Sequence, residues 1–341
     1  MQTYRAVMLR GKGGLEKLEE VELPLSPPAA GQIRVKVVAA GAGSTDVAMR
    51  IGKYIYAPPW PFVPGYEAVG LVDALGEGVT EFKPGDRVAA LTVYGSFAEY
   101  LTRGAEDFVP VPAGVADADA VAVILNYVTA YQMIHRSAKM QPGQTALVTG
   151  ANGGVGTALL ELLRLHGVHA LGACAEKHFG HVRALGGQPV PSRGAPLGET
   201  VRRAYPDGVD ASFDIMGGKA VGECVRATRR GGVVVGYGFM GTVVKGKTSQ
   251  WLMLRGFLTL LVGARLAGRR GIFYGITALY RKDKRPLKED LGRLFLLLQE
   301  KKLAPVVAHR LPLLAVRRSQ ELLLAGGVTG KIVLLRELGL S

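Results

Sequence analysis

The sequence predicts an α/β protein in which a small, partly open β-barrel is joined to a doubly wound parallel sheet. Two observations lead to this prediction. Short alternating strands fill the first third of the chain, and from residue 145 onward strands alternate with helices. With 341 residues, the chain is long enough for two domains that each have a core.

The first 122 residues have the pattern of a β-barrel. Apolar and polar residues alternate over short runs, and turn signals separate them, such as Ser-Pro-Pro at 26–28 and Lys-Pro-Gly-Asp at 83–86. Regular short strands of this kind are typical of a partly open barrel. The runs cover residues 4–9, 33–39, 68–74, 87–91 and 97–101.

Residues 145–156, TALVTGANGGVG, form the most informative motif. A short apolar strand enters a turn with Gly150, Gly153, Gly154 and Gly156, and an amphipathic helix follows. Because glycine has no Cβ, phosphates can approach this backbone, and the N–H groups at the start of the helix attract an anion. Glycine also serves tight turns for steric reasons alone, so the motif indicates a dinucleotide only in this strand–turn–helix context.

The alternation of strands and helices continues to residue 276 and then changes. An apparent last strand at 270–276 is followed by elements that lead back to the barrel. The sequence therefore predicts a discontinuous barrel domain, 1–122 with 300–341, into which a dinucleotide-binding domain, 123–299, is inserted. The expected strands are 169–173, 209–215, 232–236, 305–313 and 330–335, and the expected helices are 177–185, 219–228, 287–302 and 315–324.

The end of the second strand of the parallel sheet indicates which dinucleotide is bound. NAD enzymes place Asp or Glu there, to hold the ribose 2′-hydroxyl. Here the strand ends in Gly-Ala-Cys-Ala at 172–175, and Lys177 follows. A cation attracts a 2′-phosphate, which favours NADP(H) over NAD(H). Two alternatives stay open: Lys177 is an ordinary surface lysine, or it pairs with Glu176.

Composition bears on partners and location. The net charge is +14, and arginines occur in pairs, but no zinc finger or aromatic RNA-binding motif accompanies them. We therefore expect a solvated basic surface and no specific nucleic-acid partner. Only two cysteines occur, and the charged N-terminus does not have the pattern of a signal peptide. Both features favour a cytoplasmic protein.

One apolar segment, 251–266, has the sequence WLMLRGFLTLLVGARL. It is too short and too charged to span a bilayer. We expect a helix that is buried beside the sheet or under a dimer partner, and an interfacial membrane helix is the minor alternative. Because the apolar strand 270–276 would form an exposed sheet edge, the sequence also predicts a homodimer in which this edge is paired.

Several segments together resemble the zinc-lacking, quinone-oxidoreductase-type members of the medium-chain dehydrogenase/reductase superfamily. NYVTAY at 126–131 and the apolar region before residue 270 are also similar to the vesicle amine-transport protein branch. The resemblance implies a GroES-like barrel and a Rossmann sheet. The other matching segments are AAGAGSTDVAMRIGKY at 39–54, PFVPGYEAVG at 61–70, VTEFKPGDRVAAL at 79–91, GSFAEY at 95–100, the glycine turn and GKIVLL at 330–335.

The resemblance also indicates which chemistry to expect. Zinc-dependent relatives have Cys where this chain has Gly43 and His where it has Tyr66, so we expect no zinc. It implies NADPH-dependent hydride transfer to a quinone or an α,β-unsaturated carbonyl, a reaction that needs no Lewis acid. Tyr54 is the favoured proton donor, with Tyr56, Tyr94, Tyr131 or water as alternatives. The alternative function is an accessory protein with little or no turnover, associated with a membrane or a partner.

Cofactor contacts are carried over by the same resemblance. Gly43 replaces an Asn that contacts the cofactor in relatives, and Val-Pro-Ser at 190–192 replaces an adenosine-contacting Ile-Asp-Tyr. Arg193 could compensate by binding phosphate, and Lys331 has a purely structural role as its alternative. The implied contacts are Thr129 near the nicotinamide, Gly153, Gly154 and Val155 at the pyrophosphate, Lys177 at the 2′-phosphate, Tyr237 and Gly238 on the nicotinamide side, and Lys331 from the C-terminal return.

Overall fold

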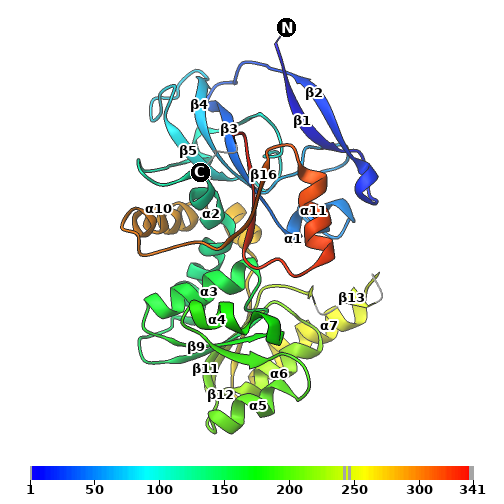
Figure 1. Cartoon of the computed structure of the whole chain (residues 1–341), viewed down its shortest axis with the longest axis vertical. Helices are drawn as coiled ribbons and strands as arrows, with labels where there is room; N and C mark the ends of the chain where they lie inside the picture. The colour runs from blue at the N-terminus through cyan, green and yellow to red at the C-terminus, as the bar shows by residue number, and fades with distance from the viewer. Residues whose placement is uncertain (1, 241–242, 245–246, 338–341) are drawn as a thin grey trace. The chain divides into compact units, whose positions relative to one another are not determined.

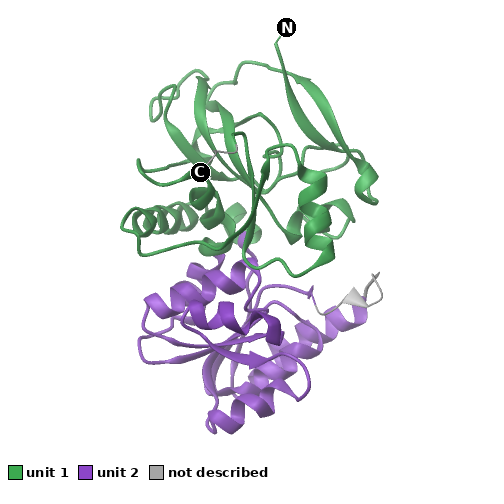
Figure 2. Ribbon diagram, in the orientation of Figure 1, with its two compact units in different colours: residues 1–128, 277–341 green, residues 129–276 purple. Residues whose placement is uncertain are grey.

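The computed structural model describes residues 2–240, 243–244 and 247–337, and it divides the chain into two compact units (Figure 2). Unit 1 comprises Met1–Val128 with Thr277–Ser341, and unit 2 comprises Thr129–Ile276. The discontinuous arrangement follows from the C-terminal strand β17 (Lys331–Leu335), which pairs with β3 (Gln32–Ala42) near the start of the chain. Figure 1 shows the course of the chain.

The second boundary between the units differs from the predicted one at 299/300. Helices α9 (Ile276–Lys282) and α10 (Arg285–Gln299) belong almost wholly to unit 1 because they bond to residues of its barrel segment. The Tyr280 hydroxyl donates to Asp107 Oδ1 at 2.8 Å, and Lys288 Nζ donates to the carbonyl of Glu106 at 3.1 Å. The first boundary lies at 128/129 rather than 122/123, within helix α2 (Asp117–Gln132).

Unit 1 contains a seven-stranded sheet that curves as a partly open barrel (Figure 1). Buried and partly buried residues alternate along most of β3, which reflects its position between core and surface. The strand order is β16-β17-β3-β4-β5-β7, β6 also pairs with β3, and β1 and β2 form a separate ladder. Further bounds are β1 Thr3–Leu9, β2 Leu18–Pro24, β4 Glu67–Leu75, β5 Arg87–Leu91, β6 Tyr100–Gly104, β7 Val109–Pro110 and β16 Val307–Pro312, with helices α1 Ser44–Arg50 and α11 Val316–Ala325.

Unit 2 is a six-stranded parallel sheet with the order β10-β9-β8-β11-β12-β15. This is the order of a doubly wound dinucleotide-binding sheet, and it reverses between β8 and β11. The strands are β8 Thr145–Thr149, β9 His169–Cys174, β10 Gln188–Pro191, β11 Val209–Asp214, β12 Thr228–Gly236 and β15 Arg270–Phe273. The helices are α3 Gly154–Leu165, α4 Phe179–Ala184, α5 Leu197–Ala204, α6 Lys219–Ala227 and α7 Gln250–Leu258, and α7 continues through a π-helical turn, Thr259–Gly263, into α8 Ala264–Leu266.

The predicted fold class is confirmed: the chain combines a partly open barrel with a doubly wound parallel sheet. Several elements have no counterpart in the prediction, among them β10 and α5 of unit 2 and β2, β7, α1 and α9. Pro189 and Pro191 obscure β10, and the sheet tolerates them because β10 is an edge strand. Strand β15, the last strand of unit 2, ends at Phe273, three residues earlier than expected.

Candidate functional site

Three hydroxyl groups meet in unit 1. The Tyr54 hydroxyl lies 2.6 Å from the Tyr66 hydroxyl and 2.6 Å from Thr277 Oγ1, and Tyr66 and Thr277 are also hydrogen-bonded to each other. Tyr54 follows α1, Tyr66 precedes β4, and Thr277 lies in α9. The last two side chains are buried and Tyr54 is partly exposed, so Tyr54 is the member of this hydroxyl cluster that solvent or a ligand can reach.

The hydroxyl cluster sets the acidity of Tyr54. Burial raises the pKa of the Tyr54 phenol, and the hydrogen bonds from Thr277 and Tyr66 act in the opposite direction. Burial also raises the pKa of Tyr66, which therefore stays protonated. Each hydroxyl has one proton to donate, so the two neighbours can both donate to the Tyr54 oxygen when that oxygen has lost its own proton.

An ionic cluster of Asp46, Glu67 and Lys331 is buried in the same unit. Lys331 Nζ is bonded to Glu67 Oε1, and Glu67 Oε2 accepts a hydrogen bond of 2.6 Å from the Leu125 amide. Gly41 makes room for the pair, because a Cβ at this position would lie 2.6 Å from Lys331 Cε. Burial raises the pKa of the Glu67 carboxyl, and the neighbouring ammonium partly offsets this effect.

Asp46 has a different environment from Glu67. Its Oδ2 accepts a hydrogen bond of 2.9 Å from the Gly43 amide and caps α1, whereas Oδ1 is buried with no partner among the described residues. Burial raises the pKa of this carboxyl to about 7. Asp46 therefore changes its protonation state near neutral pH, which an exposed aspartate does not.

Tyr66 and Glu67 are both bonded to neighbouring side chains of unit 1. At the position where zinc-dependent relatives have His, the Tyr66 hydroxyl is engaged in the hydroxyl cluster, and the adjacent Glu67 carboxylate already carries the Lys331 ammonium. Zinc prefers Cys and His ligands, and a buried ammonium beside the carboxylate would repel the ion. Across the described residues, no three or more His, Cys, Asp or Glu side chains are grouped so that they could hold a metal ion.

In unit 2, the glycine turn joins β8 to α3. Gly150 has a φ of +61°, a left-handed conformation that favours glycine. Gly153 is the N-cap of α3, and a Cβ on Gly156 would lie 2.8 Å from the backbone of Ala151. The turn is therefore packed too closely for side chains, and the first N–H groups of α3, including those of Gly154 and Val155, have no acceptor within the helix. Such a helix start suits an anion.

A second contact fixes the strands at the point where their order reverses. Thr149 Oγ1 donates to Asp214 Oδ1 at 2.7 Å, and the Ile215 amide donates to Thr149 Oγ1 at 3.1 Å. The other Asp214 oxygen accepts from the Gly217 amide at 2.8 Å. These bonds hold the carboxyl ends of β8 and β11 together, at the crevice where doubly wound sheets bind their ligands.

A cavity of about 260 Å³ opens at the carboxyl ends of β9 and β10. Arg193 contributes a cation to its lining, and Glu176 contributes a carboxylate. Lys177 is exposed and does not line the cavity. The sequence analysis favoured Lys177 as the cation that binds a 2′-phosphate, but in the structure Arg193 is the cation in the cavity wall. The remaining lining residues are Cys174, Ala175, Pro191 and Ser192.

The other residues singled out from the sequence have varied surroundings. The Tyr237 hydroxyl is buried and has no hydrogen-bond partner in the part of the chain that is described, and burial raises its pKa. Gly238 packs against Ile215, and Thr129 is buried in α2. Lys331 is paired with Glu67, as described above.

The alternative tyrosines lie outside the hydroxyl cluster. Tyr56 packs edge-on against Tyr54, and Arg281 lies over its ring. Tyr94 carries the Arg103 guanidinium over its ring, and the Tyr131 ring lies 4.2 Å from that of His135. The sequence did not identify Tyr66 and Thr277 as partners of Tyr54. No local signal links the three, because Thr277 is 223 residues from Tyr54.

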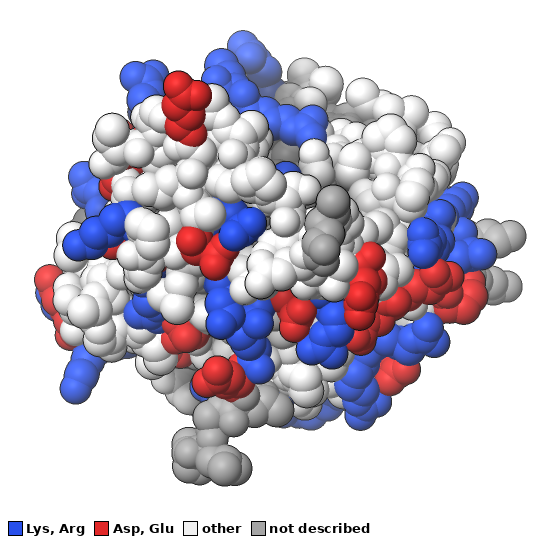
Figure 3. Space-filling model, turned by 90° about the horizontal axis from the view of Figure 1, so that it is seen from above, with Lys and Arg blue, Asp and Glu red and all other residues white. Residues whose placement is uncertain are grey.

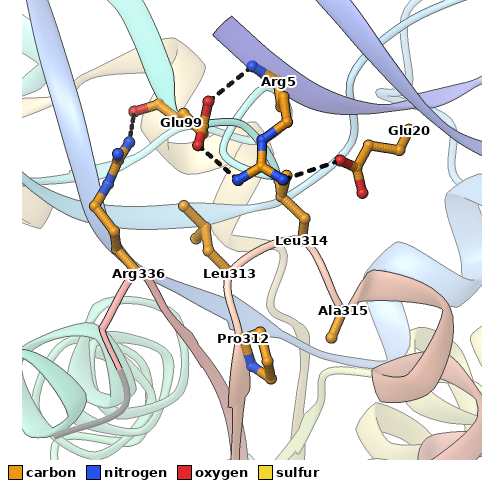
Figure 4. Close-up of a pocket in the computed structure, with 8 residues that line it drawn as sticks. All are labelled: Arg5, Glu20, Glu99, Pro312, Leu313, Leu314, Ala315 and Arg336. Carbon is orange, nitrogen blue, oxygen red and sulfur yellow. Dashed lines mark hydrogen bonds and ion pairs between the residues drawn. The ribbon is translucent and has the colours of Figure 1, made fainter.

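A further cavity of about 360 Å³ in unit 1 is lined by charged residues that pair with one another (Figure 4). Arg5 bonds to Glu20 and Glu99 through its guanidinium, at 3.3 and 3.1 Å. Arg336 donates to the carbonyl of Glu99 at 2.6 Å. Because these charges satisfy each other, we assign this network to the structure of the barrel.

Two segments of the chain match models of known protein families. Residues 29–113 match the family model described as "Alcohol dehydrogenase GroES-like domain", and residues 193–334 match "Zinc-binding dehydrogenase". The human synaptic vesicle membrane protein VAT-1 homolog is 32% identical over 74% of this chain and 65% of its own length. The chain thus aligns with less than two thirds of that relative. Rat quinone oxidoreductase is 25% identical over 97% of both chains.

Solved structures agree with this similarity. A human VAT-1 homolog-like protein superimposes with a TM-score of 0.84 and 26% identity over 99% of both chains. The Escherichia coli quinone oxidoreductase complexed with NADPH has a TM-score of 0.85 and 24% identity over 97% of this chain and 99% of its own, a likeness of fold. The chain therefore belongs to the medium-chain dehydrogenase/reductase superfamily, among relatives that include the quinone oxidoreductases and the VAT-1 homologues.

Proposed function

We propose that this protein is an NADPH-dependent reductase that transfers hydride to a quinone or an α,β-unsaturated carbonyl without zinc. The observation that carries the proposal is the hydroxyl cluster: where zinc-dependent relatives have a metal-ligating His, Tyr66 supports a second, accessible tyrosine. Such a site can stabilise and protonate an oxygen but cannot act as a Lewis acid. The quinone oxidoreductases among the relatives support the same reaction type.

The residues of unit 2 fit a dinucleotide. The backbone N–H groups of Gly154 and Val155 would bind the pyrophosphate at the start of α3, and the N-cap Gly153 would let it approach the backbone. Arg193 in the cavity wall and the nearby Lys177 would bind the 2′-phosphate, outweighing the single carboxylate of Glu176. Thr129, Tyr237 and Gly238 would lie on the nicotinamide side, and the Tyr237 hydroxyl is buried with no hydrogen-bond partner among the described residues. When bound, NADPH supplies the hydride.

Tyr54 is the proposed proton donor. An acceptor that receives hydride develops negative charge on its oxygen, and the Tyr54 hydroxyl would donate its proton to that oxygen. Tyr66 and Thr277 would then both donate hydrogen bonds to the Tyr54 phenolate, which stabilises it within a buried environment. Tyr66 and Thr277 are positioning residues in this account.

We also propose a homodimer that forms through the edge strand β15. This strand ends the sheet of unit 2, so its outer backbone groups have no neighbouring strand among the described residues. Pairing with the same strand of a second copy would remove this exposed edge. The cytoplasm is the proposed location, because Cys174 and Cys224 are both free thiols, as expected in a reducing compartment. No described helix is long and apolar enough to cross a membrane.

The experiment is a turnover assay that follows NADPH oxidation with a naphthoquinone and with a linear enone. We expect NADPH-dependent reduction of at least one acceptor and a fall in kcat of about hundredfold in Tyr54→Phe. Tyr94→Phe is the matched control, because it removes a hydroxyl outside the cluster. Equal kcat values for the two variants would refute the role of Tyr54.

A second candidate is an accessory protein with little or no turnover, associated with a membrane or a partner. Helix α7 and its continuation into α8 favour it, because they expose large apolar side chains from Trp251 to Leu266, and such a surface serves docking rather than catalysis. Saturable NADPH binding with no reduction of any quinone or enone would support this candidate over the reductase.

A further inference from the structure

A guanidinium group lies beside the hydroxyl cluster of unit 1. Helix α9 carries Thr277 and Arg281 four residues apart, so both side chains lie on one face of the helix, about 6 Å apart along its axis. Thr277 Oγ1 lies 2.6 Å from the Tyr54 hydroxyl, as described above. The same face of α9 therefore presents a hydroxyl group to Tyr54 and, one turn further on, a cation.

Contacts with Tyr56 hold the Arg281 side chain close to Tyr54. Its guanidinium carbon lies 4.9 Å from the centre of the Tyr56 ring, and its Nη2 donates to the Tyr56 carbonyl at 3.4 Å. The Tyr56 ring is in turn edge-on to the Tyr54 ring, with 5.7 Å between their centres. Burial raises the pKa of Tyr54, and the positive charge of Arg281 opposes this effect, so charge at this position reaches the Tyr54 oxygen.

Arg281 has no counterion within the described ranges of the chain. Its side chain is exposed and forms no ion pair there. The two segments that build this part of the surface, residues 47–66 and 276–282, contain no Asp or Glu. The nearest acid in sequence, Asp283, lies 2.9 Å from the Arg285 guanidinium and is already paired. The positive charge of Arg281 is therefore available to an anion.

Other arginines of unit 1 differ from Arg281 in this respect. Arg34 lies 2.5 Å from Asp73, and Arg87 lies 2.5 Å from Asp117. On the face drawn in Figure 3, basic and acidic side chains are likewise interspersed. An unpaired guanidinium that is held beside a reactive hydroxyl group thus stands apart from the paired charges of the barrel surface.

We propose that the acceptor is an α,β-unsaturated ketone that carries a carboxylate, and that Arg281 binds this carboxylate; the inference rests on the reductase function proposed above. The planar guanidinium can donate two parallel hydrogen bonds to a carboxylate, which makes Arg281 the residue that determines specificity. A 4-oxo-2-enoate has its ketone and its carboxylate at opposite ends of one double bond. Its ketone oxygen can therefore meet Tyr54 while its carboxylate meets Arg281.

The reaction on such an acceptor reduces its double bond. The carbon β to the ketone receives the hydride that NADPH supplies, the double bond becomes a single bond, and an electron pair moves to the ketone oxygen. That oxygen takes the Tyr54 proton, which solvent replaces, and the enol returns to the ketone, so that a saturated keto acid and NADP⁺ result. The carboxylate makes and breaks no bond, so Arg281 governs binding of the acceptor and not proton transfer.

The test compares 4-oxo-4-phenylbut-2-enoate with its primary amide, which has the same ketone and double bond but no charge. An NADPH oxidation assay gives the ratio of kcat/KM for the acid to kcat/KM for the amide, and this ratio is compared between proteins. Arg281→Gln should lower the ratio by about tenfold, and Arg281→Glu, which repels the acid, should lower it further. Salt at about 0.5 M should lower the ratio of the unmodified chain, because it screens the guanidinium.

The matched control is Lys282→Gln. Lys282 is exposed, and this substitution changes the net charge as Arg281→Gln does, but position 282 lies about 100° further around α9. The control should keep the ratio of the unmodified chain. An equal fall in the two variants would be an effect of overall charge and would overturn the proposal, and so would an unchanged ratio in Arg281→Gln.

A binding measurement separates this inference from the reductase proposal. The saturated acid 4-oxo-4-phenylbutanoate has no double bond to reduce, and its dissociation constant, measured by calorimetric titration, should rise about tenfold in Arg281→Gln. If this rise is seen but neither acceptor is reduced, the reductase proposal is wrong and the carboxylate site stands. If the acceptors are reduced but the saturated acid binds equally to both proteins, the role of Arg281 is wrong and the reductase stands.

Discussion

The two units build their candidate sites by different physical means. In unit 1 the site is made of side chains from distant segments: three hydroxyls in mutual contact and a buried ionic cluster of Asp46, Glu67 and Lys331. In unit 2 it is made of backbone, with a glycine turn and the first N–H groups of α3. The side-chain site depends on burial for its chemistry, whereas the backbone site depends on the absence of side chains.

This difference determines how each site should fail. Removing one charge from unit 1 leaves its partner buried, so stability should fall. Adding one methyl group to the turn in unit 2 should block a ligand while the sheet stays folded, because the turn lies at the start of a helix, beyond the end of β8. The predictions below test this contrast, from the largest expected effect to the smallest.

Lys331→Met should destabilise the protein by about 3–5 kcal/mol, because it leaves the Glu67 carboxylate buried without its cation. Chemical denaturation measures the free energy of unfolding. Adding Glu67→Gln should restore part of the loss, since the uncompensated charge is then gone. In unit 2, Lys177→Met should change stability by less than about 0.5 kcal/mol, because Lys177 is exposed. A similar loss of stability in Lys331→Met and Lys177→Met would contradict the difference between the two units.

The pH dependence of stability should reveal Asp46. Its pKa is about 7 in the folded chain against 3.8 for an exposed aspartate, so the folded state holds the proton more tightly. The contribution of this group is therefore fully present below about pH 4 and is lost as the pH rises through about 7, by at most about 4 kcal/mol. The Asp46→Asn variant should lack this decline. The difference between the unfolding free energies of the two proteins should therefore change between about pH 4 and pH 7. A difference that does not vary with pH would contradict the assignment.

Gly156→Ala should weaken NADPH binding by about hundredfold, because the new methyl group collides with the backbone of Ala151 and displaces the start of α3. Nucleotide fluorescence measures the affinity. Gly180→Ala is the matched control, since a Cβ there meets nothing within 4 Å. If Gly156→Ala unfolds unit 2 instead, circular dichroism will show the loss of helix and strand. The contrast between the side-chain site of unit 1 and the backbone site of unit 2 would then be wrong.

Thr277→Val should lower kcat by about tenfold by removing one hydrogen bond to the Tyr54 oxygen, and Thr277→Ser should restore it. The same change should raise the pKa of Tyr54, which ultraviolet titration detects as a difference from Tyr54→Phe. A structural role alone would not move this pKa. An unchanged titration in Thr277→Val would remove Thr277 from the site.

Much of unit 2 could be predicted from the sequence because its signals are local. The glycines that shape the turn are adjacent in the chain, and the strand–helix alternation fixes the parallel sheet. The exception was β10, where two prolines conceal an edge strand. The position of Arg193 at the cavity depends on where β10 ends, so the sequence favoured Lys177 for the phosphate instead.

The site of unit 1 was only partly predictable. Tyr54 emerged from a family resemblance, but its partners did not, because Thr277 lies beyond a domain boundary that the sequence places at 299/300 and the structure places at 276/277. Burial is a second reason. Nothing in the local sequence shows that Asp46 retains an unpaired oxygen or that Lys331 is directed at Glu67. Such features arise only when strands from both ends of the chain pair.

The most direct test of the central claim is a titration of the purified protein with NADPH and, separately, NADH, following nicotinamide fluorescence. The account predicts saturable NADPH binding at least about tenfold tighter than NADH binding, a preference that Arg193→Ala reduces while leaving NADH affinity unchanged. If neither nucleotide binds, or NADH binds as tightly as NADPH, the proposed cofactor and the reductase built on it are contradicted.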